Sequence, residues 1–105
     1  MNATAVSRFE TFADFYPYYL GEHANSTCRR LHFFGTTLVI AVGLGALFSG
    51  RFPLLLLLPL CGYGFAWIGH FFFEKNRPAT FRHPLYSLIG DFVMYRDMWI
   101  GRVPF

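Results

Sequence analysis

The sequence predicts an all-α membrane protein, built from a helical hairpin that spans the bilayer and two flanking amphipathic or partly inserted helices. Of the 105 residues, 54% are hydrophobic and 14% are charged, whereas a soluble domain carries about 25% charged residues. Two long apolar runs follow one another with only a short break. The length allows one domain at most, so we assign residues 1–105 to a single membrane domain.

The first predicted helix covers about residues 5–20. Phe9, Phe12 and Tyr16 recur at helical spacing, and charged residues interrupt the apolar run. This pattern is typical of an amphipathic helix at the membrane interface, and Pro17 is a candidate for its end. The segment lacks a basic stretch followed by a clean apolar one, so we do not predict a signal peptide.

The two spanning helices are predicted over residues 25–49 and 53–75. Their apolar runs approach or exceed the length of about 20 residues that a spanning helix needs. Gly50 and Arg51 form the turn, and Pro59 inside the second run is tolerated in membrane helices. The alternative is a buried hairpin in a soluble bundle, but so short a chain could not cover two such helices.

The fourth predicted helix covers about residues 84–100. Ser87, Asp91 and Tyr95 recur at four-residue spacing and therefore share one helix face. This helix is partly apolar, so we expect it to lie at the membrane surface or to dip into the bundle.

The flanking charges orient the hairpin. Basic residues lie before the first span and after the second, and the turn between the spans carries only Arg51. The positive-inside rule therefore places both chain ends in the cytoplasm, in the inner membrane of a bacterium or the endoplasmic reticulum of a eukaryote. The net charge of +3 is explained by this topology and by contact with anionic membrane lipids, so no nucleic-acid partner is predicted.

Three smaller features complete the description of the helices. Cys28 and Cys61 form no motif, so we interpret them as structural residues without a disulfide. The glycosylation sequon that begins at Asn25 would not be used on the cytoplasmic side. Gly43 and Gly45 offer a surface for close packing against another helix, so a homo-oligomer is one option.

Each spanning helix carries one polar stripe. Lipid cannot satisfy polar side chains, so both stripes are expected to face protein. The first stripe comprises Asn25, Arg29, His32 and Thr36, and the second comprises Tyr63, Trp67, His70, Glu74 and Arg77.

The hairpin places two histidines at one depth. His32 lies 19 residues before Arg51, and His70 lies 19 residues after it. At about 1.5 Å per residue, both are about 28 Å from the turn, which is close to the hydrocarbon thickness of about 30 Å. The remaining histidines and one carboxylate fall on the same side of the membrane. The groups expected to converge at this cytoplasmic face are His23, His32, His70, His83 and Glu74.

This set of side chains predicts a metal site. Imidazole and carboxylate groups suit iron, zinc, copper or nickel, and the sequence does not distinguish among these metals. His70 and Glu74 are four residues apart on one helix and can present both side chains to one ion. The alternative is a hydrogen-bonded polar cluster that holds the four helices together.

Two motifs resemble a known family. The segments HANSTCRRLHFFG at 23–35 and WIGHFFFEKNRPA at 67–79 are similar to the fungal 2-hydroxy fatty acid dioxygenase family. The resemblance extends over about residues 18–91. It implies a multi-span membrane protein that uses Fe(II) and O₂ to shorten 2-hydroxy fatty acids by one carbon, in α-oxidation. The family's required histidines match His23, His32, His70 and His83.

Coordination chemistry fits this implication. A 2-hydroxy acid chelates iron through its hydroxyl and one carboxylate oxygen. Three protein ligands, these two substrate oxygens and one O₂ then occupy the six coordination positions of octahedral iron. Three protein ligands are also the number in the two-histidine, one-carboxylate triad of iron oxygenases. The expected order of ligands begins with His70, His32 and His23 and continues with His83 and Glu74. Of these, we expect His32 and His70 to be the catalytic histidines.

Other polar residues are candidates for supporting roles. Arg29 and Arg77 suit the substrate carboxylate, because a guanidinium binds it bidentately, although headgroup binding is an alternative for Arg77. Asn25, Asp91 and Ser87 are candidates for orienting the ligands from outside, or for purely structural hydrogen bonds. With the head group at the cytoplasmic face, the acyl chain would extend between the helices toward the bilayer core.

Two other function classes fit the same residues. Facing His32 and His70 side chains could bind one haem axially, which a strong Soret band would reveal. A non-enzymatic bundle for transport or lipid binding would contain no transition metal.

Overall fold

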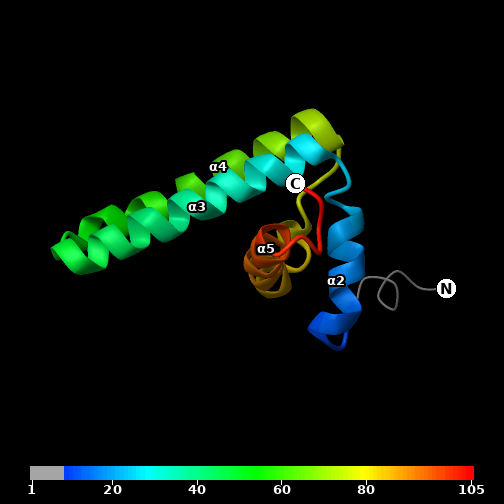
Figure 1. The fold of residues 1–105 in the computed structure, drawn as a ribbon, viewed down its shortest axis with the longest axis horizontal. Coiled ribbons are helices and arrows are strands. Elements are labelled where there is room, and N and C mark those ends of the chain that lie inside the picture. The colour runs from blue at the N-terminus through cyan, green and yellow to red at the C-terminus, as the bar shows by residue number, and fades with distance from the viewer. Residues whose placement is uncertain (1–8) are drawn as a thin grey trace.

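The computed structural model describes residues 9–105, and this part of the chain is helical without any strand, which confirms the predicted all-α class. Figure 1 shows helices α3 (Ser26–Ser49) and α4 (Leu58–Ile68) side by side as a long antiparallel hairpin. Helices α2 (Phe12–Gly21) and α5 (Pro84–Trp99) pack near the open end of this hairpin, away from its turn. Both arms of the hairpin are long and apolar enough to cross a membrane.

Helix α2 begins later than the predicted 5–20, because Thr11 is its N-cap and accepts a hydrogen bond from the backbone N–H of Asp14. Residues 5–8 lie outside the described part of the chain. Pro17 does not end the helix, which continues to Gly21. The buried side chains of Phe15 and Tyr19 pack in the core shared with α5. This packing stabilises the helical turns before and after Pro17.

Helix α3 has a defined cap at each end. The side chain of Asn25 accepts hydrogen bonds from the N–H groups of Thr27 and Cys28, at 2.9 and 3.2 Å. Gly50 ends the helix in the left-handed conformation with φ 71°, which favours glycine. The observed range of Ser26–Ser49 compares with 25–49 in the sequence-based prediction.

The second arm changes its helical form twice. It begins as a 3₁₀ helix, η1 (Phe52–Leu57), continues as α4 and ends as a π-helix, η2 (Gly69–Glu74). Pro59 lies in the first turn of α4, where its missing N–H is tolerated. The π-helix was not predicted. Such segments insert an extra residue into a helix, often at functional sites, and this one contains His70.

Glycines bring the two arms into close contact. A Cβ atom on Gly35 would stand 3.0 Å from the carbonyl oxygen of Cys61, and a Cβ on Gly69 would stand 2.9 Å from the Sγ of Cys28. Both cysteines are free thiols. Only glycine therefore fits at these two positions without displacement of the neighbouring arm.

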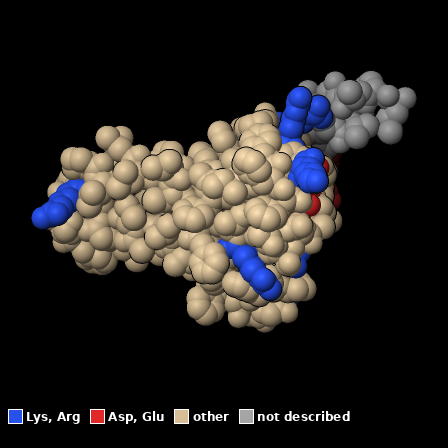
Figure 2. Space-filling view, turned by 90° about the horizontal axis from the view of Figure 1, so that it is seen from above, with Lys and Arg blue, Asp and Glu red and all other residues tan. Residues whose placement is uncertain are grey.

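The buried core lies at the open end of the hairpin, not along it. The largest cluster of buried hydrophobic side chains comprises Phe15, Tyr19, Ala79, Met94, Met98 and Val103. Along the arms, by contrast, only 22% and 11% of the residues in the most apolar stretches are buried. The face in Figure 2 shows the same division, with a basic group at the hairpin tip, where Arg51 forms the turn, and the other charged residues toward the open end.

Candidate metal centre

Three histidines from three parts of the chain meet at the open end of the hairpin. His23 follows α2, His32 belongs to α3 and His70 belongs to η2. Their ring centroids lie 4.4 Å (His23–His32), 4.5 Å (His23–His70) and 4.9 Å (His32–His70) apart, and all three side chains are buried. The expectation that the hairpin brings His32 and His70 together is therefore confirmed.

Each of these rings directs its Nδ1 atom at an oxygen acceptor. The contacts are His23 to the Tyr19 carbonyl at 2.6 Å, His32 to the Cys28 carbonyl at 2.8 Å and His70 to Oδ1 of Asn76 at 2.7 Å. Because a carbonyl oxygen only accepts, these contacts assign the proton of each neutral ring to Nδ1. Each Nε2 atom is then left with a bare lone pair, which is the form of imidazole that binds metals.

Two of these lone pairs face one another. The Nε2 atoms of His23 and His32 lie 3.0 Å apart, and neither carries a hydrogen in the assigned tautomer. Burial, together with the neighbouring His32 and His70, holds the pKa of His23 well below its usual value, so its ring is neutral. A separation of 3.0 Å suits adjacent ligands of one ion at metal–nitrogen distances of about 2.1 Å. The three side chains therefore fit a metal ion.

Asn76 supports this centre and was not predicted. Its Nδ2 donates to the backbone oxygen of Glu22 at 3.1 Å and to the Glu22 carboxylate at 2.9 Å, which turns Oδ1 toward His70. Its backbone N–H donates to the His70 carbonyl at 3.0 Å. Lys75, between η2 and Asn76, adopts φ 58°, a conformation that is uncommon without glycine. Helical spacing gives no signal for this contact, because the turn at Lys75 creates it.

Two predicted ligands lie outside the three-histidine cluster. The ring of His83 packs against Phe9 and Phe15, with centroid distances of 5.2 and 5.4 Å, because it stands at the start of α5 beside α2. The Glu74 carboxylate accepts a hydrogen bond from the backbone N–H of Asn25, at the start of α3. The convergence predicted for five groups is thus observed for three, and the other two side chains make contacts between the helices.

The two predicted substrate-binding arginines differ in their surroundings. Arg29 donates to the backbone oxygens of His23, Ala24 and Pro104, at 3.0, 2.6 and 2.9 Å, and so joins the loop before α3 to the C-terminal segment. Arg77 is exposed and lines a separate surface pocket of about 220 Å³. Neither guanidinium lines the pockets beside the three histidines, and a substrate role for either remains a prediction.

The predicted supporting residues lie close to the histidines. Asn25 caps α3, as described above. Asp91 accepts a hydrogen bond from the Tyr19 hydroxyl, and burial raises the pKa of its carboxyl to about 7, although that hydrogen bond opposes the shift. Ser87 is 1% exposed, and its hydroxyl has no hydrogen-bond partner within residues 9–105.

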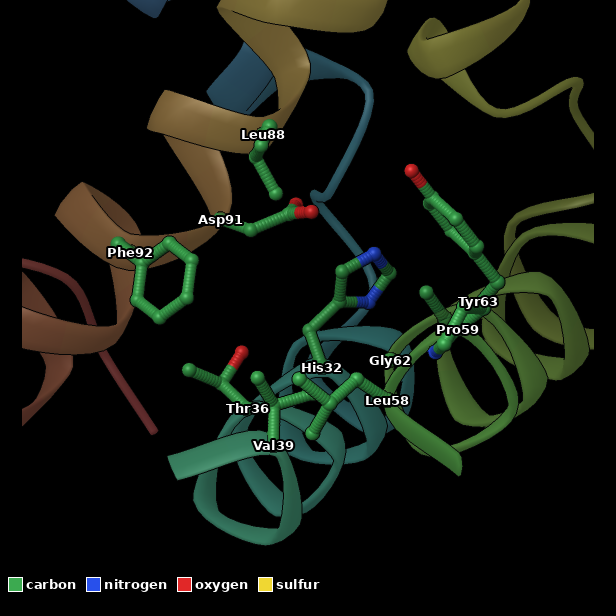
Figure 3. A pocket seen from close by; sticks show the side chains of 11 residues that line it. His32, Thr36, Val39, Leu58, Pro59, Gly62, Tyr63, Leu88, Asp91 and Phe92 are labelled. Carbon is green, nitrogen blue, oxygen red and sulfur yellow. The ribbon is translucent and has the colours of Figure 1, made fainter. Parts of the chain in front are cut away.

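Two adjoining pockets reach this centre. A small pocket is lined by all three histidines together with Tyr19, Ser87 and Asp91. A larger apolar pocket of about 240 Å³ lies between the hairpin and α5. His32 and Asp91 line both, and Figure 3 shows the His32 ring and the Asp91 carboxylate pointing toward one another across the larger pocket.

The fold and the site define an all-helical protein with two potential membrane-spanning arms and a buried cluster of three histidines suited to a metal ion. The chain belongs to the Mpo1-like family, described as 2-hydroxy-palmitic acid dioxygenase Mpo1-like, which it matches over residues 9–103. This match confirms the resemblance seen in the two sequence motifs. No curated protein and no solved structure gives a significant match.

Proposed function

We propose that this protein is an integral membrane dioxygenase that uses Fe(II) and O₂ to shorten 2-hydroxy fatty acids by one carbon. The observation that carries the proposal is the buried cluster of three bare Nε2 atoms on His23, His32 and His70. The description of the family, a 2-hydroxy-palmitic acid dioxygenase, supports the class of reaction and the class of substrate.

The reaction balances with one O₂ per turnover. The bond between C1 and C2 of the hydroxy acid breaks, C2 becomes the carboxyl carbon of the shortened acid, and C1 leaves as CO₂ with one water. The four electrons that the hydroxy acid loses reduce the O₂. Bound Fe(II) would supply the chelation of the hydroxy acid and the activation of O₂.

Backbone and side-chain groups of the protein prepare the site for this chemistry. The Tyr19 and Cys28 carbonyls and the Asn76 side chain hold the three rings in one tautomer and orientation. The burial of these rings keeps bulk water away from the reacting atoms. Ser87 and Asp91, in the pocket beside the rings, present polar atoms to the head group of the substrate.

The hairpin supports a location within the bilayer. Helix α3 has 24 residues, which at about 1.5 Å each span about 36 Å and cover a hydrocarbon layer of about 30 Å. Phe48 and Leu56 near the tip are 88% and 83% exposed, which is costly in water. We propose that both chain ends lie on the cytoplasmic side, in the bacterial inner membrane or the endoplasmic reticulum.

The geometry favours a non-haem site over the haem alternative. The His32 and His70 rings are 4.9 Å apart, and the His23 ring contacts both, at 4.4 and 4.5 Å. A porphyrin ring between His32 and His70 would have to displace His23. The third alternative, a non-enzymatic bundle, does not explain three inward-facing lone pairs.

The proposal is tested on purified protein, reconstituted anaerobically with Fe(II) in detergent. We expect one iron per chain, no Soret band, and one O₂ consumed per 2-hydroxyhexadecanoate shortened. Hexadecanoate, which lacks the 2-hydroxyl, is the matched control and should consume no O₂, and zinc-loaded protein should be inactive. Failure to bind any transition metal after reconstitution would contradict the metal site, and a strong Soret band would contradict its non-haem character.

A further inference from the structure

The apolar pocket beside His32 has one polar end and one apolar end. On α3 it is lined by His32, Thr36 and Val39, which follow at intervals of four and three residues and share one helix face. Asp91 of α5 joins His32 and Thr36 at the polar end. From there the pocket runs toward the hairpin turn, as far as Leu58. A ligand that fills it therefore needs a polar head and an apolar body.

The residues at the rim of this pocket are exposed on the outer surface of the protein. Pro59 on α4 is exposed, and Leu88 and Phe92 on α5 are 47% and 43% exposed. All three are apolar side chains beside the arms that we place in the bilayer. The pocket is therefore accessible sideways from lipid, between α4 and α5.

We propose that this pocket is the seat of the substrate's acyl chain, which slides in from the bilayer with its carboxyl end toward His32 and Asp91. This inference rests on the proposed function. With about 240 Å³, the pocket is smaller than typical ligand sites of about 300–1,000 Å³. It therefore holds only the part of a long chain nearest the head group, and the remainder lies among the lipid chains.

Val39 and Gly62 set the width of the seat. A Cβ atom on Gly62 would stand 3.3 Å from Cγ2 of Val39, so the two arms are in contact where these residues line the pocket, and a larger side chain at either position would narrow it. Lipid is as apolar as the pocket, so burial of the chain here adds little affinity. The seat acts by position instead, because it aligns the chain so that C1 and C2 stand at the histidines.

The first test compares substrates of two lengths. In Val39→Phe, an aromatic ring occupies the seat. We expect kcat/KM for 2-hydroxyhexadecanoate to fall by about 10- to 200-fold, and kcat/KM for the short 2-hydroxyhexanoate to fall much less. Leu38→Phe places the same ring at an exposed position of α3 outside the pocket and should leave kcat/KM unchanged for both substrates. Phe92→Ala widens the rim and should raise turnover of chains with a methyl branch. Equal losses of kcat/KM for both substrate lengths in Val39→Phe, or the same losses in Leu38→Phe, would contradict the binding of the acyl chain in this pocket.

The second test does not depend on turnover. A 2-hydroxy fatty acid with a photoreactive diazirine in the part of the chain nearest the head group is illuminated with the protein in lipid nanodiscs, and the labelled residues are mapped. We expect labels concentrated at 58–63 and 88–92, and fewer in Val39→Phe. Labels spread evenly over the outer surface of the arms would contradict the binding of the acyl chain in this pocket. Labelling of the pocket without any O₂ consumption would contradict only the proposed reaction. Turnover without labelling of the pocket would contradict only the placement of the acyl chain there.

Discussion

The Nδ1 atom of His70 lies 2.7 Å from Oδ1 of Asn76. Asn76 is itself held by two hydrogen bonds to Glu22, so its oxygen cannot turn away from the ring. The two hydrogen bonds to Glu22 join the segment after the second arm to the end of α2. The contact of His70 with Asn76 leaves the Nε2 atom of His70 free to face the other two histidines.

Replacement of Asn76 by leucine should weaken metal binding. Without the acceptor, the His70 ring can rotate or change its tautomer, and loss of such a partner lowers metal affinity by about 10- to 100-fold. The affinity is measured by competition with a chelator in detergent. Glu22→Gln, which retains an acceptor for the Asn76 amide, is the control and should bind metal normally. Equal affinities of Asn76→Leu and the unmodified protein would show that Asn76 does not position the ring.

Single replacements of the histidines should separate ligands from structural residues. We expect His23→Gln, His32→Gln and His70→Gln to lose the metal, since each removes one of the converging nitrogens. His83→Gln should keep full metal content, because its ring packs among aromatic side chains. Metal analysis after reconstitution measures the metal content of all four variants. Metal loss in His83→Gln comparable to that in the other three would contradict the three-histidine set.

Gly69→Ala should destabilise the contact between the arms. Its Cβ would stand 2.9 Å from Sγ and 3.1 Å from Cα of Cys28, and such overpacking costs about 1–3 kcal/mol. Because His70 is the next residue, metal affinity should fall as well. Gly64→Ala is the matched control, since its nearest neighbour is 3.9 Å away, and a change of glycine to alanine within a helix adds up to about 1 kcal/mol of stability. Thermal unfolding of the metal-free variants compares the two, and equal unfolding temperatures would contradict the close packing at Gly69.

Tyr16→Phe should weaken the contact between α2 and α5 in a pH-dependent way. The Tyr16 hydroxyl donates to Asp97 at 2.8 Å. Burial opposes the ionisation of Asp97, but the hydrogen bonds from Tyr16 and Arg96 outweigh it and hold the pKa of this carboxyl below its usual value. The stabilisation is therefore present above the ordinary aspartate pKa of about 4 and is lost as the pH falls below it.

The expected cost of Tyr16→Phe is about 1–2 kcal/mol at pH 7, and it should shrink below pH about 4. Thermal melting followed by circular dichroism at both pH values measures this difference. Tyr63→Phe is the control, because the Tyr63 hydroxyl makes no hydrogen bond within the described residues 9–105. A cost that is the same at both pH values would show that the ionised Asp97 is not involved.

Ser87→Ala should separate stability from substrate binding. An unsatisfied buried hydroxyl costs about 1–3 kcal/mol, so its removal should leave the unfolding temperature of the metal-free protein unchanged or higher. The KM for the hydroxy acid should rise, because the small pocket loses a polar partner for the head group. Lower thermal stability without any change in KM would assign Ser87 a structural role instead.

Local patterns in the sequence were sufficient to predict several of these features. The two apolar runs and the turn at Gly50 predict the hairpin, because helix geometry and the cost of exposed apolar surface depend on residues close together in the chain. The equal distances of His32 and His70 from Arg51 predict their meeting for the same reason. The resemblance of the two motifs to a dioxygenase family is confirmed by the family match.

The tertiary structure alone decided which other groups join those two histidines. His23 reaches them because α2 packs on α5 through Phe15 and Tyr19, whereas His83 is drawn into the aromatic contacts of the same packing. Asn76 depends on the left-handed turn at Lys75, and the apolar pocket depends on where α5 lies beside the hairpin. These contacts join residues far apart in the chain, and they are determined by side-chain packing and loop conformation rather than by any periodic pattern.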